Sequence, residues 1–163
     1  MAVSAFRRFV DFLAGMGLIV RDDPPKLVDL TVREWGPAAD GFALSIRQAR
    51  NADPEAQAAI SAVLRNIGEA PAQMTVPGGL FFFRLDITGP DGTAVPMSPF
   101  GHELFKPARN TERVEINLAP GEVTETEIPV GSIFHLRKKG RYRARACCEL
   151  PTGAVLHSNE IVI

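Results

Sequence analysis

Short apolar stretches recur along the chain from Lys26 onward, separated by clusters of turn-forming residues. They come at intervals of about ten to fifteen residues, which is the spacing expected of a β-sandwich or barrel. The alternation is clearest where Phe81, Phe83, Leu85 and Ile87 stand at every second position, because successive side chains of a strand point to opposite faces. The pattern predicts strands within residues 27–35, 41–48, 56–67, 80–88, 114–118, 123–130, 140–150 and 154–163.

Residues 56–67 fit a helix as well as a strand. Their alanines and glutamine suit a helix, whereas Ile60, Ala62 and Leu64 alternate with other residues. Turn residues at 66–69 end the segment and another apolar run comes soon after, which favours a strand. No helix of standard length is needed after residue 25, and without crossover helices the sheets are expected to be antiparallel.

Turn chemistry predicts where the chain reverses. The sequence Gly-Pro-Asp-Gly at 89–92 predicts a tight reversal after the strand at 80–88. Ala-Pro-Gly-Glu at 119–122 turns the chain into the next strand, and Pro-Thr-Gly at 151–153 predicts the final hairpin.

The first twenty residues do not fit the strand pattern. Phe6, Phe9 and Leu13 recur at helical spacing, which predicts a short amphipathic helix packed on the domain or on a partner. A secretory signal is the rival interpretation, although Asp11 interrupts the apolar part and no A-x-A cleavage pattern comes after it. The apolar stretch is also shorter than the ~20 residues that a membrane-spanning helix needs. The predicted division is an N-terminal helix and linker over 1–25 and a sandwich domain over 26–163.

Composition agrees with one globular domain. The chain has 163 residues, of which 45% are hydrophobic and 23% are charged, so it can bury a core of its own. The net charge of −1 gives no long-range field that would attract nucleic acid or an anionic membrane surface. Neither partner is therefore expected.

The two cysteines, Cys147 and Cys148, are neighbours in a predicted strand. Their side chains should point to opposite faces, which makes them poor partners for a disulfide. We expect two buried or half-buried apolar residues. The lack of a disulfide framework favours a reducing compartment, and hence the cytoplasm, while the N-terminal stretch leaves export or a periplasmic location as the alternative.

The C-terminal part of the chain has a recognisable pattern. It consists of Lys139-Gly140-Arg141-Tyr142-Arg143-Ala144-Arg145-Ala146, then a turn, and then Ser158-Asn159-Glu160-Ile161-Val162-Ile163. The pattern resembles the last two strands of bacterial immunoglobulin-like or fibronectin-type-III-like modules, over roughly residues 35–163. The resemblance implies a sandwich in which Tyr142 is a corner tyrosine whose hydroxyl bonds nearby backbone. Ala144 stands where a true immunoglobulin domain has its second core cysteine, so packing alone is expected to hold the two sheets together.

Motifs for catalysis or metal binding are missing from the sequence. It contains no glycine-rich phosphate loop, no G-x-S-x-G and no zinc-type cysteine cluster. His102-Glu103 begins like H-E-x-x-H, but Lys106 stands where the second histidine belongs. We therefore expect no enzyme, no cofactor, no metal, and separate surface or edge positions for His102, His135 and His157.

Basic residues gather between positions 137 and 145, and alternation places Arg141, Arg143 and Arg145 on one face of one strand. A phosphate groove would want such a row, preferably with interleaved aromatic residues. Tyr142 should point to the other face, so a solvated sheet face with opposite charges across from the row is favoured. The acidic residues expected there are Glu112, Glu115, Glu122, Glu125 and Glu127.

A non-catalytic protein-binding or assembly module is the function that this sequence favours. The alternative is a protease-inhibitor or chaperone-like sandwich that presents a loop or strand edge, suggested by the proline- and glycine-rich connection at 96–107. A hydrolase or metal enzyme is the weakest hypothesis. The expected partner is an unidentified protein or a second copy of the chain in a homo-oligomer, with no nucleic acid and no membrane span. The predicted contact residues are Phe6, Phe9, Leu13, Phe82, Arg141, Arg143 and Arg145.

Overall fold

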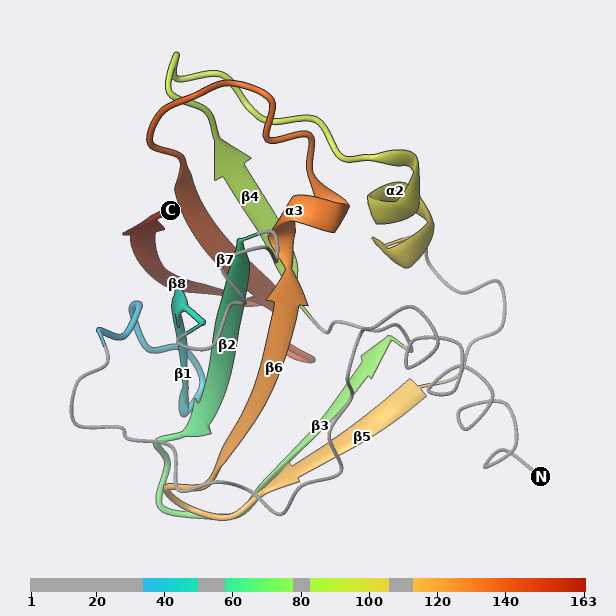
Figure 1. The fold of residues 1–163 in the computed structure, drawn as a ribbon. Coiled ribbons are helices and arrows are strands. Elements are labelled where there is room, and N and C mark those ends of the chain that lie inside the picture. The colour runs from blue at the N-terminus through green and yellow to red at the C-terminus, as the bar shows by residue number, and fades with distance from the viewer. Residues whose placement is uncertain (1–33, 50–57, 78–82, 106–112) are drawn as a thin grey trace. The chain divides into compact units, whose positions relative to one another are not determined.

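The computed structural model describes residues 34–49, 58–77, 83–105 and 113–163 (Figure 1). The elements in this part of the chain are the strands β1 (Phe42–Gln48), β2 (Ala59–Asn66), β3 (Ala72–Pro77), β4 (Arg84–Thr88), β5 (Arg113–Leu118), β6 (Val123–Pro129), β7 (Arg143–Glu149) and β8 (Val155–Val162), with the short helices α2 (Pro99–Phe105) and α3 (Val130–Ile133). Every strand pairing is antiparallel, so the predicted all-β antiparallel fold is confirmed. The predicted N-terminal helix and linker, and nearly all of the strand expected at 27–35, lie outside the described residues.

The described strands form three sheets, with the strand orders β1-β2-β6, β3-β5 and β4-β7-β8. One buried cluster takes side chains from all three sheets, because each strand turns its alternate apolar residues the same way. It includes Leu44, Leu64, Met74, Leu85, Leu118, Ile128 and Leu156. Residues 56–67 therefore do contain a strand, β2, as the turn residues after it predicted.

A corner connects two of the sheets. β2 pairs with β6, and β3 pairs with β5, so residues 59–77 and 113–129 run side by side across a kink. Asn66 lies buried at this kink, where its side-chain NH₂ donates to the carbonyl oxygens of Leu118 and Ala70, both at 2.9 Å. Its side-chain oxygen accepts the amide of Gly68, also at 2.9 Å. One buried amide thus fixes both loops of the corner.

The connection at 119–122 is the turn that the sequence predicted. The amide of Glu122 donates to the carbonyl of Ala119 at 2.9 Å, and Gly121 has φ +79°. A positive φ at the third residue, after a proline at the second, is the geometry of a type II turn. The turn carries the chain from β5 into β6, which belongs to another sheet.

The tight reversal at 89–92 is also confirmed, since the amide of Gly92 donates to the carbonyl of Gly89 at 2.9 Å. Beyond the reversal, a single bridge between Thr88 and Ala94 takes the place of a second hairpin strand. The ladder partner of β4 is β7, which comes much later in the chain.

β7 and β8 form the predicted final hairpin, with one irregularity. Ser158 and Asn159 together oppose Ala146, so β8 carries one extra residue there. The amide of Ala146 loses its ladder partner and instead donates to the hydroxyl of Ser158 at 2.8 Å. Because side chains alternate with a period of two, this bulge keeps His157 and Glu160 on the same exposed face of the sheet.

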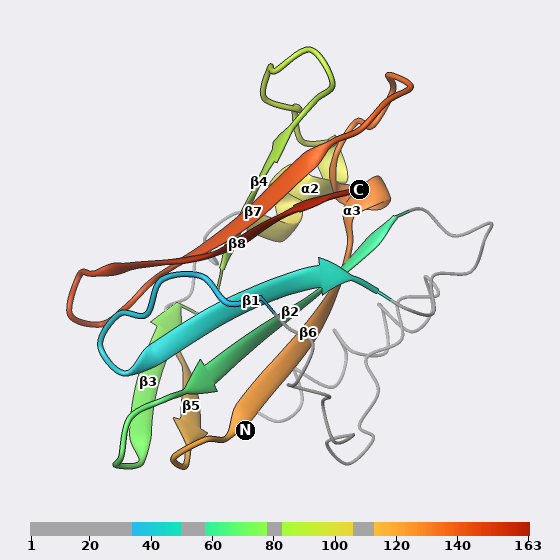
Figure 2. The ribbon, with the colours of Figure 1, turned by 90° about the vertical axis from the view of Figure 1, so that its left-hand side faces the viewer.

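The same bulge joins two sheets. The side-chain amide of Asn159 accepts the backbone N–H of Ile46 at 2.8 Å and donates to its carbonyl at 3.0 Å. β1 accordingly runs beside β8 (Figure 2). Packing was expected to be the only link between the sheets, because Ala144 stands where an immunoglobulin domain has its second core cysteine. Both cysteines are free, but that expectation was wrong, because the side-chain amide of Asn159 also links β8 to β1 through hydrogen bonds.

Residues 96–107 were expected to be a long loop, but α2 occupies most of that range. The hydroxyl of Ser98 accepts the amide of Gly101 at 3.0 Å, and Pro99 takes the first helical position, where its missing N–H costs nothing. Gly101 lies against α3 so closely that a Cβ atom there would come within 2.4 Å of the Ile133 carbonyl oxygen. The proline and glycine that suggested a loop are therefore a helix start and a close packing contact.

Candidate binding surface

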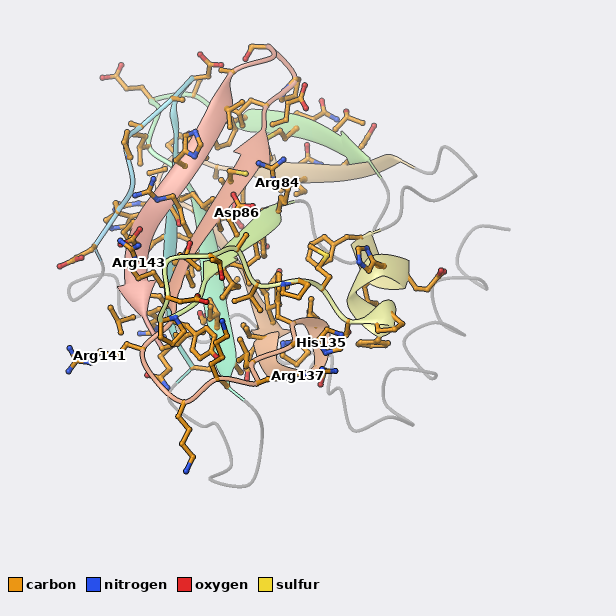
Figure 3. All side chains as sticks on the ribbon, turned by 90° about the horizontal axis from the view of Figure 1, so that it is seen from above. Arg84, Asp86, His135, Arg137, Arg141 and Arg143 are labelled. Atoms are coloured by element: carbon orange, nitrogen blue, oxygen red, sulfur yellow. The ribbon has the colours of Figure 1, made fainter. Side chains whose placement is uncertain are left out.

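The exposed face of the β4-β7-β8 sheet carries part of the predicted basic row. Arg143 and Arg145 are exposed while Ala144 and Ala146 between and after them are buried, as alternation predicted. Arg141 is exposed but precedes β7 rather than belonging to it. Figure 3 shows Arg141 extending away from the ribbon, Arg143 on β7, and Arg84 and Asp86 on β4.

Arg145 has an ion-pair partner within the sheet. Its guanidinium lies 3.6 Å from the carboxylate of Glu160 on β8, and Asp86 is its cross-strand partner on β4. The acidic partners predicted for this row lie elsewhere, so that prediction was wrong. Glu115 lies on β5, Glu122 in the turn after it, and Glu125 and Glu127 on β6. Glu112 lies outside the described residues. Sequence proximity failed here because β5 and β6 belong to other sheets.

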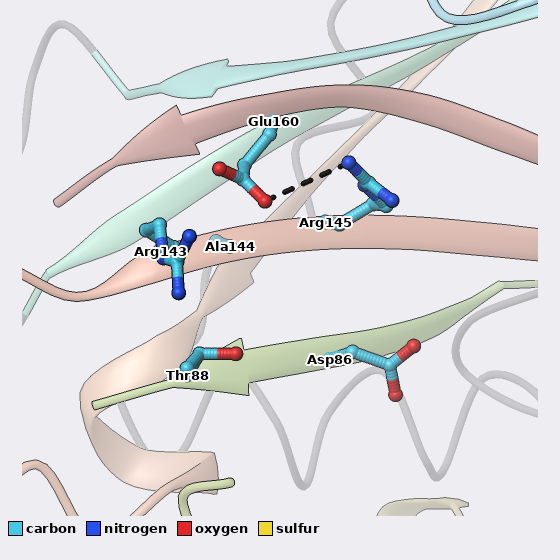
Figure 4. A pocket seen from close by; sticks show the side chains of 6 residues that line it. All are labelled: Asp86, Thr88, Arg143, Ala144, Arg145 and Glu160. Atoms are coloured by element: carbon cyan, nitrogen blue, oxygen red, sulfur yellow. Dashed lines mark ion pairs between the residues drawn. The ribbon is translucent and has the colours of Figure 1, made fainter. Parts of the chain in front are cut away.

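A shallow hollow of about 180 Å³ lies over Ala144 on this face (Figure 4). Its rim consists of Asp86, Thr88, Arg143, Arg145 and Glu160. Two guanidinium groups and two carboxylates cancel in formal charge, so the hollow has no preference for a free anion or cation. We therefore do not place a ligand site in it.

The stretch from Arg137 to Arg141, here named the basic loop, lies between α3 and β7, and all of its residues are exposed. Tyr142 comes directly after it and is buried. The hydroxyl of Tyr142 accepts the backbone N–H of Lys138 at 2.9 Å and donates to the Lys138 carbonyl at 2.5 Å. The corner hydrogen bonding that the resemblance implied for this tyrosine is thus present.

Two further contacts hold the basic loop against the turn at 89–92. Gly140 has φ +142°, and a Cβ atom there would come within 2.6 Å of Pro90. The ammonium of Lys138 pairs with the carboxylate of Asp91, which Thr93 also contacts. These hydrogen bonds, foremost the one from Lys138, hold the pKa of Asp91 well below its usual range. The loop is therefore fixed at three points.

The other cations of the basic loop have no ion-pair partner in the described part of the chain. Within the described ranges, Lys138 forms an ion pair whereas Arg137, Lys139 and Arg141 form none. Arg143 adjoins them on β7, and its cross-strand partners, Thr88 and Val162, carry no charge. The structure thus divides the predicted row: within the described residues Arg141 and Arg143 have no ion-pair partner, whereas Arg145 pairs with Glu160.

The cysteines are poor nucleophiles in this setting. Cys147 and Cys148 are both buried and unpaired. Cys147 lies between Arg84 on β4 and His157 on β8, yet burial raises its pKa despite the nearby guanidinium. Burial also raises the pKa of Cys148 to about 11. Both thiols are protonated at neutral pH, so the histidine opposite Cys147 does not create a thiolate.

The other predicted site residues do not form a site within the described part of the chain. Phe6, Phe9, Leu13 and Phe82 lie outside the described residues. The three histidines lie on α2, in the chain after α3 and on β8. Across the described part of the chain, no three histidine, cysteine or acidic side chains are placed to hold a metal ion. No helix in that part is long and apolar enough to cross a membrane.

Sequence reasoning missed the contacts that fix the basic loop. Asp91 and Pro90 were assigned only to a turn, because their partners Lys138 and Gly140 lie almost fifty positions later. A glycine directly after two lysines was a signal for a special backbone conformation, although it could not reveal which residue packs against it.

No family model matches the chain, and no curated protein matches it significantly. Among solved structures, it is similar to the X-ray structure of Northeast Structural Genomics Consortium target SoR45. That similarity has 10% sequence identity and a TM-score of 0.37, and it covers 76% of this chain and 86% of the other. A likeness at this level assigns neither a family nor an activity.

Proposed function

We propose that this chain is a non-catalytic protein-binding or assembly module built on an immunoglobulin-like sandwich. Three features support the sandwich: the strand orders β1-β2-β6 and β4-β7-β8, the neighbouring positions of β1 and β8, and the hydrogen bonding of Tyr142. Such modules bind through the loops at their ends, which a rigid scaffold positions.

The observation that carries the proposal is the basic loop. Arg137, Lys139 and Arg141 present three positive charges on a backbone that is already fixed. A pre-ordered loop loses little entropy on binding, and a cluster of one sign steers a partner of the opposite sign. An acidic protein surface is therefore the partner that fits. A nucleic acid fits less well, because the aromatic residue beside the loop, Tyr142, is buried and offers no ring for base stacking.

The structure of residues 96–105 supports this function over the inhibitor-like alternative. The suspected presenting loop contains α2, and Phe100, Leu104 and Phe105 pack against the core cluster. An inhibitory loop needs its side chains free for a target, whereas these contribute to the stability of the fold.

The experiment compares two variants of the full chain as immobilised bait in a lysate of the source organism. One carries Lys139→Glu and Arg141→Glu in the basic loop. The control carries Arg84→Glu, which reverses one exposed arginine on β4, outside the basic loop, and removes its pair with Asp86. We expect a defined partner to be retained by the wild type and the control and to be lost from the loop variant. Retention of the same proteins by all three baits, with circular dichroism showing equal folding, would overturn the proposal.

A further inference from the structure

The described part of the chain carries a second charged surface, of opposite sign, at the corner between the sheets. Glu69 and Glu122 lie in the two loops of the corner, and Glu115 lies on β5, three residues before that strand ends. All three are exposed, and none forms an ion pair with a described residue. These three residues are named the acidic corner. Glu122 also accepts the amide of Ala119 through its carboxylate at 2.7 Å, which orients the side chain without neutralising it.

Hydrogen bonds fix the two loops of the acidic corner, as they fix the basic loop. Asn66 bonds the backbone of Ala70 in one loop and of Leu118 beside the other. The amide of Asn66 itself donates to the carbonyl of Glu122 at 3.0 Å. Glu69 and Glu122 therefore lie on two loops that one buried residue holds together, just as Tyr142 holds the basic loop.

The two surfaces lie at opposite ends of one strand. β6 begins directly after Glu122 and ends at Pro129, where α3 leads on to the basic loop. Seven residues of strand span about 23 Å, which exceeds the Debye length of about 8 Å at physiological salt. Figure 1 shows the turn before β6 at the bottom and the chain between α3 and β7 at the top. The opposite charges are thus too far apart to neutralise each other within one molecule.

We propose that the partner of the basic loop is a second copy of this chain, which docks its acidic corner there. This inference rests on the proposed binding function and names its partner. The argument is charge complementarity. Although the net charge is only −1, the described part of the chain has a basic loop in which Arg137, Lys139 and Arg141 form no ion pair with a described residue, and an acidic corner in which no glutamate forms one. Because the two surfaces differ, the contact is heterologous, and repeated contacts build head-to-tail rows or closed rings.

Sedimentation velocity of the full chain at about 20 mM and about 500 mM salt tests this contact, because salt screens exposed charges. The wild type should associate with rising concentration at low salt and become monomeric at high salt. Lys139→Glu with Arg141→Glu reverses the basic loop, and Glu69→Lys with Glu115→Lys reverses the acidic corner. Each variant should be monomeric alone, whereas an equimolar mixture of the two should associate again. The Arg84→Glu control should behave as the wild type.

A wild type that stays monomeric at low salt would overturn the inference. So would a loop variant that still associates, or a mixture of folded variants that does not. The proposed function is tested separately from the self-association. If the protein is monomeric but captures another protein through Lys139 and Arg141, the proposed function stands and only the self-association is excluded.

Discussion

The hydroxyl of Tyr142 bonds both backbone groups of Lys138, accepting its N–H and donating to its carbonyl. The two residues are four positions apart, so the bonds close a tight loop around Lys139, Gly140 and Arg141. A buried ring anchored in the core thereby fixes the backbone that presents exposed cations. The stability of the sheet and the shape of the basic loop depend on the same side chain.

Replacing Tyr142 with phenylalanine keeps the buried ring and removes only the hydroxyl. We expect the free energy of unfolding to fall by about 1–3 kcal/mol, because two backbone groups lose their partner. Hydrogen exchange should speed up at the Lys138 amide more than at amides within β7. Unchanged protection of the Lys138 amide would show that this bond does not hold the loop.

Alanine substitutions at two glycines distinguish the energetic cost of backbone strain from that of a steric clash. Gly92 and Gly140 both have positive φ, but only at Gly140 would a Cβ atom meet Pro90, at 2.6 Å. Gly92→Ala should therefore cost only the conformational term of about 1 kcal/mol. Gly140→Ala should cost more in urea unfolding and should also weaken partner binding, since the basic loop must move. Equal costs for the two variants would contradict the packing of the loop on the turn.

The ion pair between Lys138 and Asp91 should make the stability of the fold depend on pH. The pKa of Asp91 is lowered in the folded protein, so its contribution to stability is present above the unfolded pKa of about 3.9 and is lost as the pH falls through the lower folded value. Lys138→Met should raise the carboxyl pKa of Asp91, measured by ¹³C NMR titration. The value should stay below that of a free aspartate because the hydrogen bonds from Thr93 remain. An unchanged pKa would rule out the pair in solution.

Asn159 offers a test of the link between the sheets. Asn159→Asp keeps the acceptor for the Ile46 amide but places a carboxylate where the Ile46 carbonyl needs a donor. We expect it to destabilise the fold above pH 5 by more than Asn159→Ala, which should itself cost about 1–3 kcal/mol. Urea unfolding measures both variants. A neutral effect of both would mean that packing between β1 and β8 suffices.

Local patterns in the sequence predicted the described strands other than β3, which was missed, because burial on one face leaves a period of two. That is why β4, β7 and β8 and the turns between strands could be placed, and why Phe83, but not Arg84, was expected in the core. The corner hydrogen bonding of Tyr142 was implied by the resemblance of the residues around it. α2 was missed, although Ser98 before Pro99 is the start signal of a helix.

Pairings between distant segments could not be predicted in the same way. Nothing near Arg145 in the sequence identifies Glu160 as its partner rather than Glu125, which pairs with Arg47 in another sheet. The same holds for Asn66, whose role as the corner clamp depends on Leu118, fifty-two positions later. The charges of the candidate surface were visible in the sequence, whereas which of them remain unpaired depends on the fold.

The reactivity of Lys139 shows whether a bound partner covers the basic loop. Brief acetylation of the free protein and of the complex formed at low salt, with mass spectrometry of both, compares the two states. We expect Lys139 to be protected several-fold in the complex, whereas Lys138 should change less because its ammonium already pairs with Asp91. Equal acetylation of Lys139 in the free and bound states, with the partner still attached, would contradict the assignment of the basic loop as the binding surface.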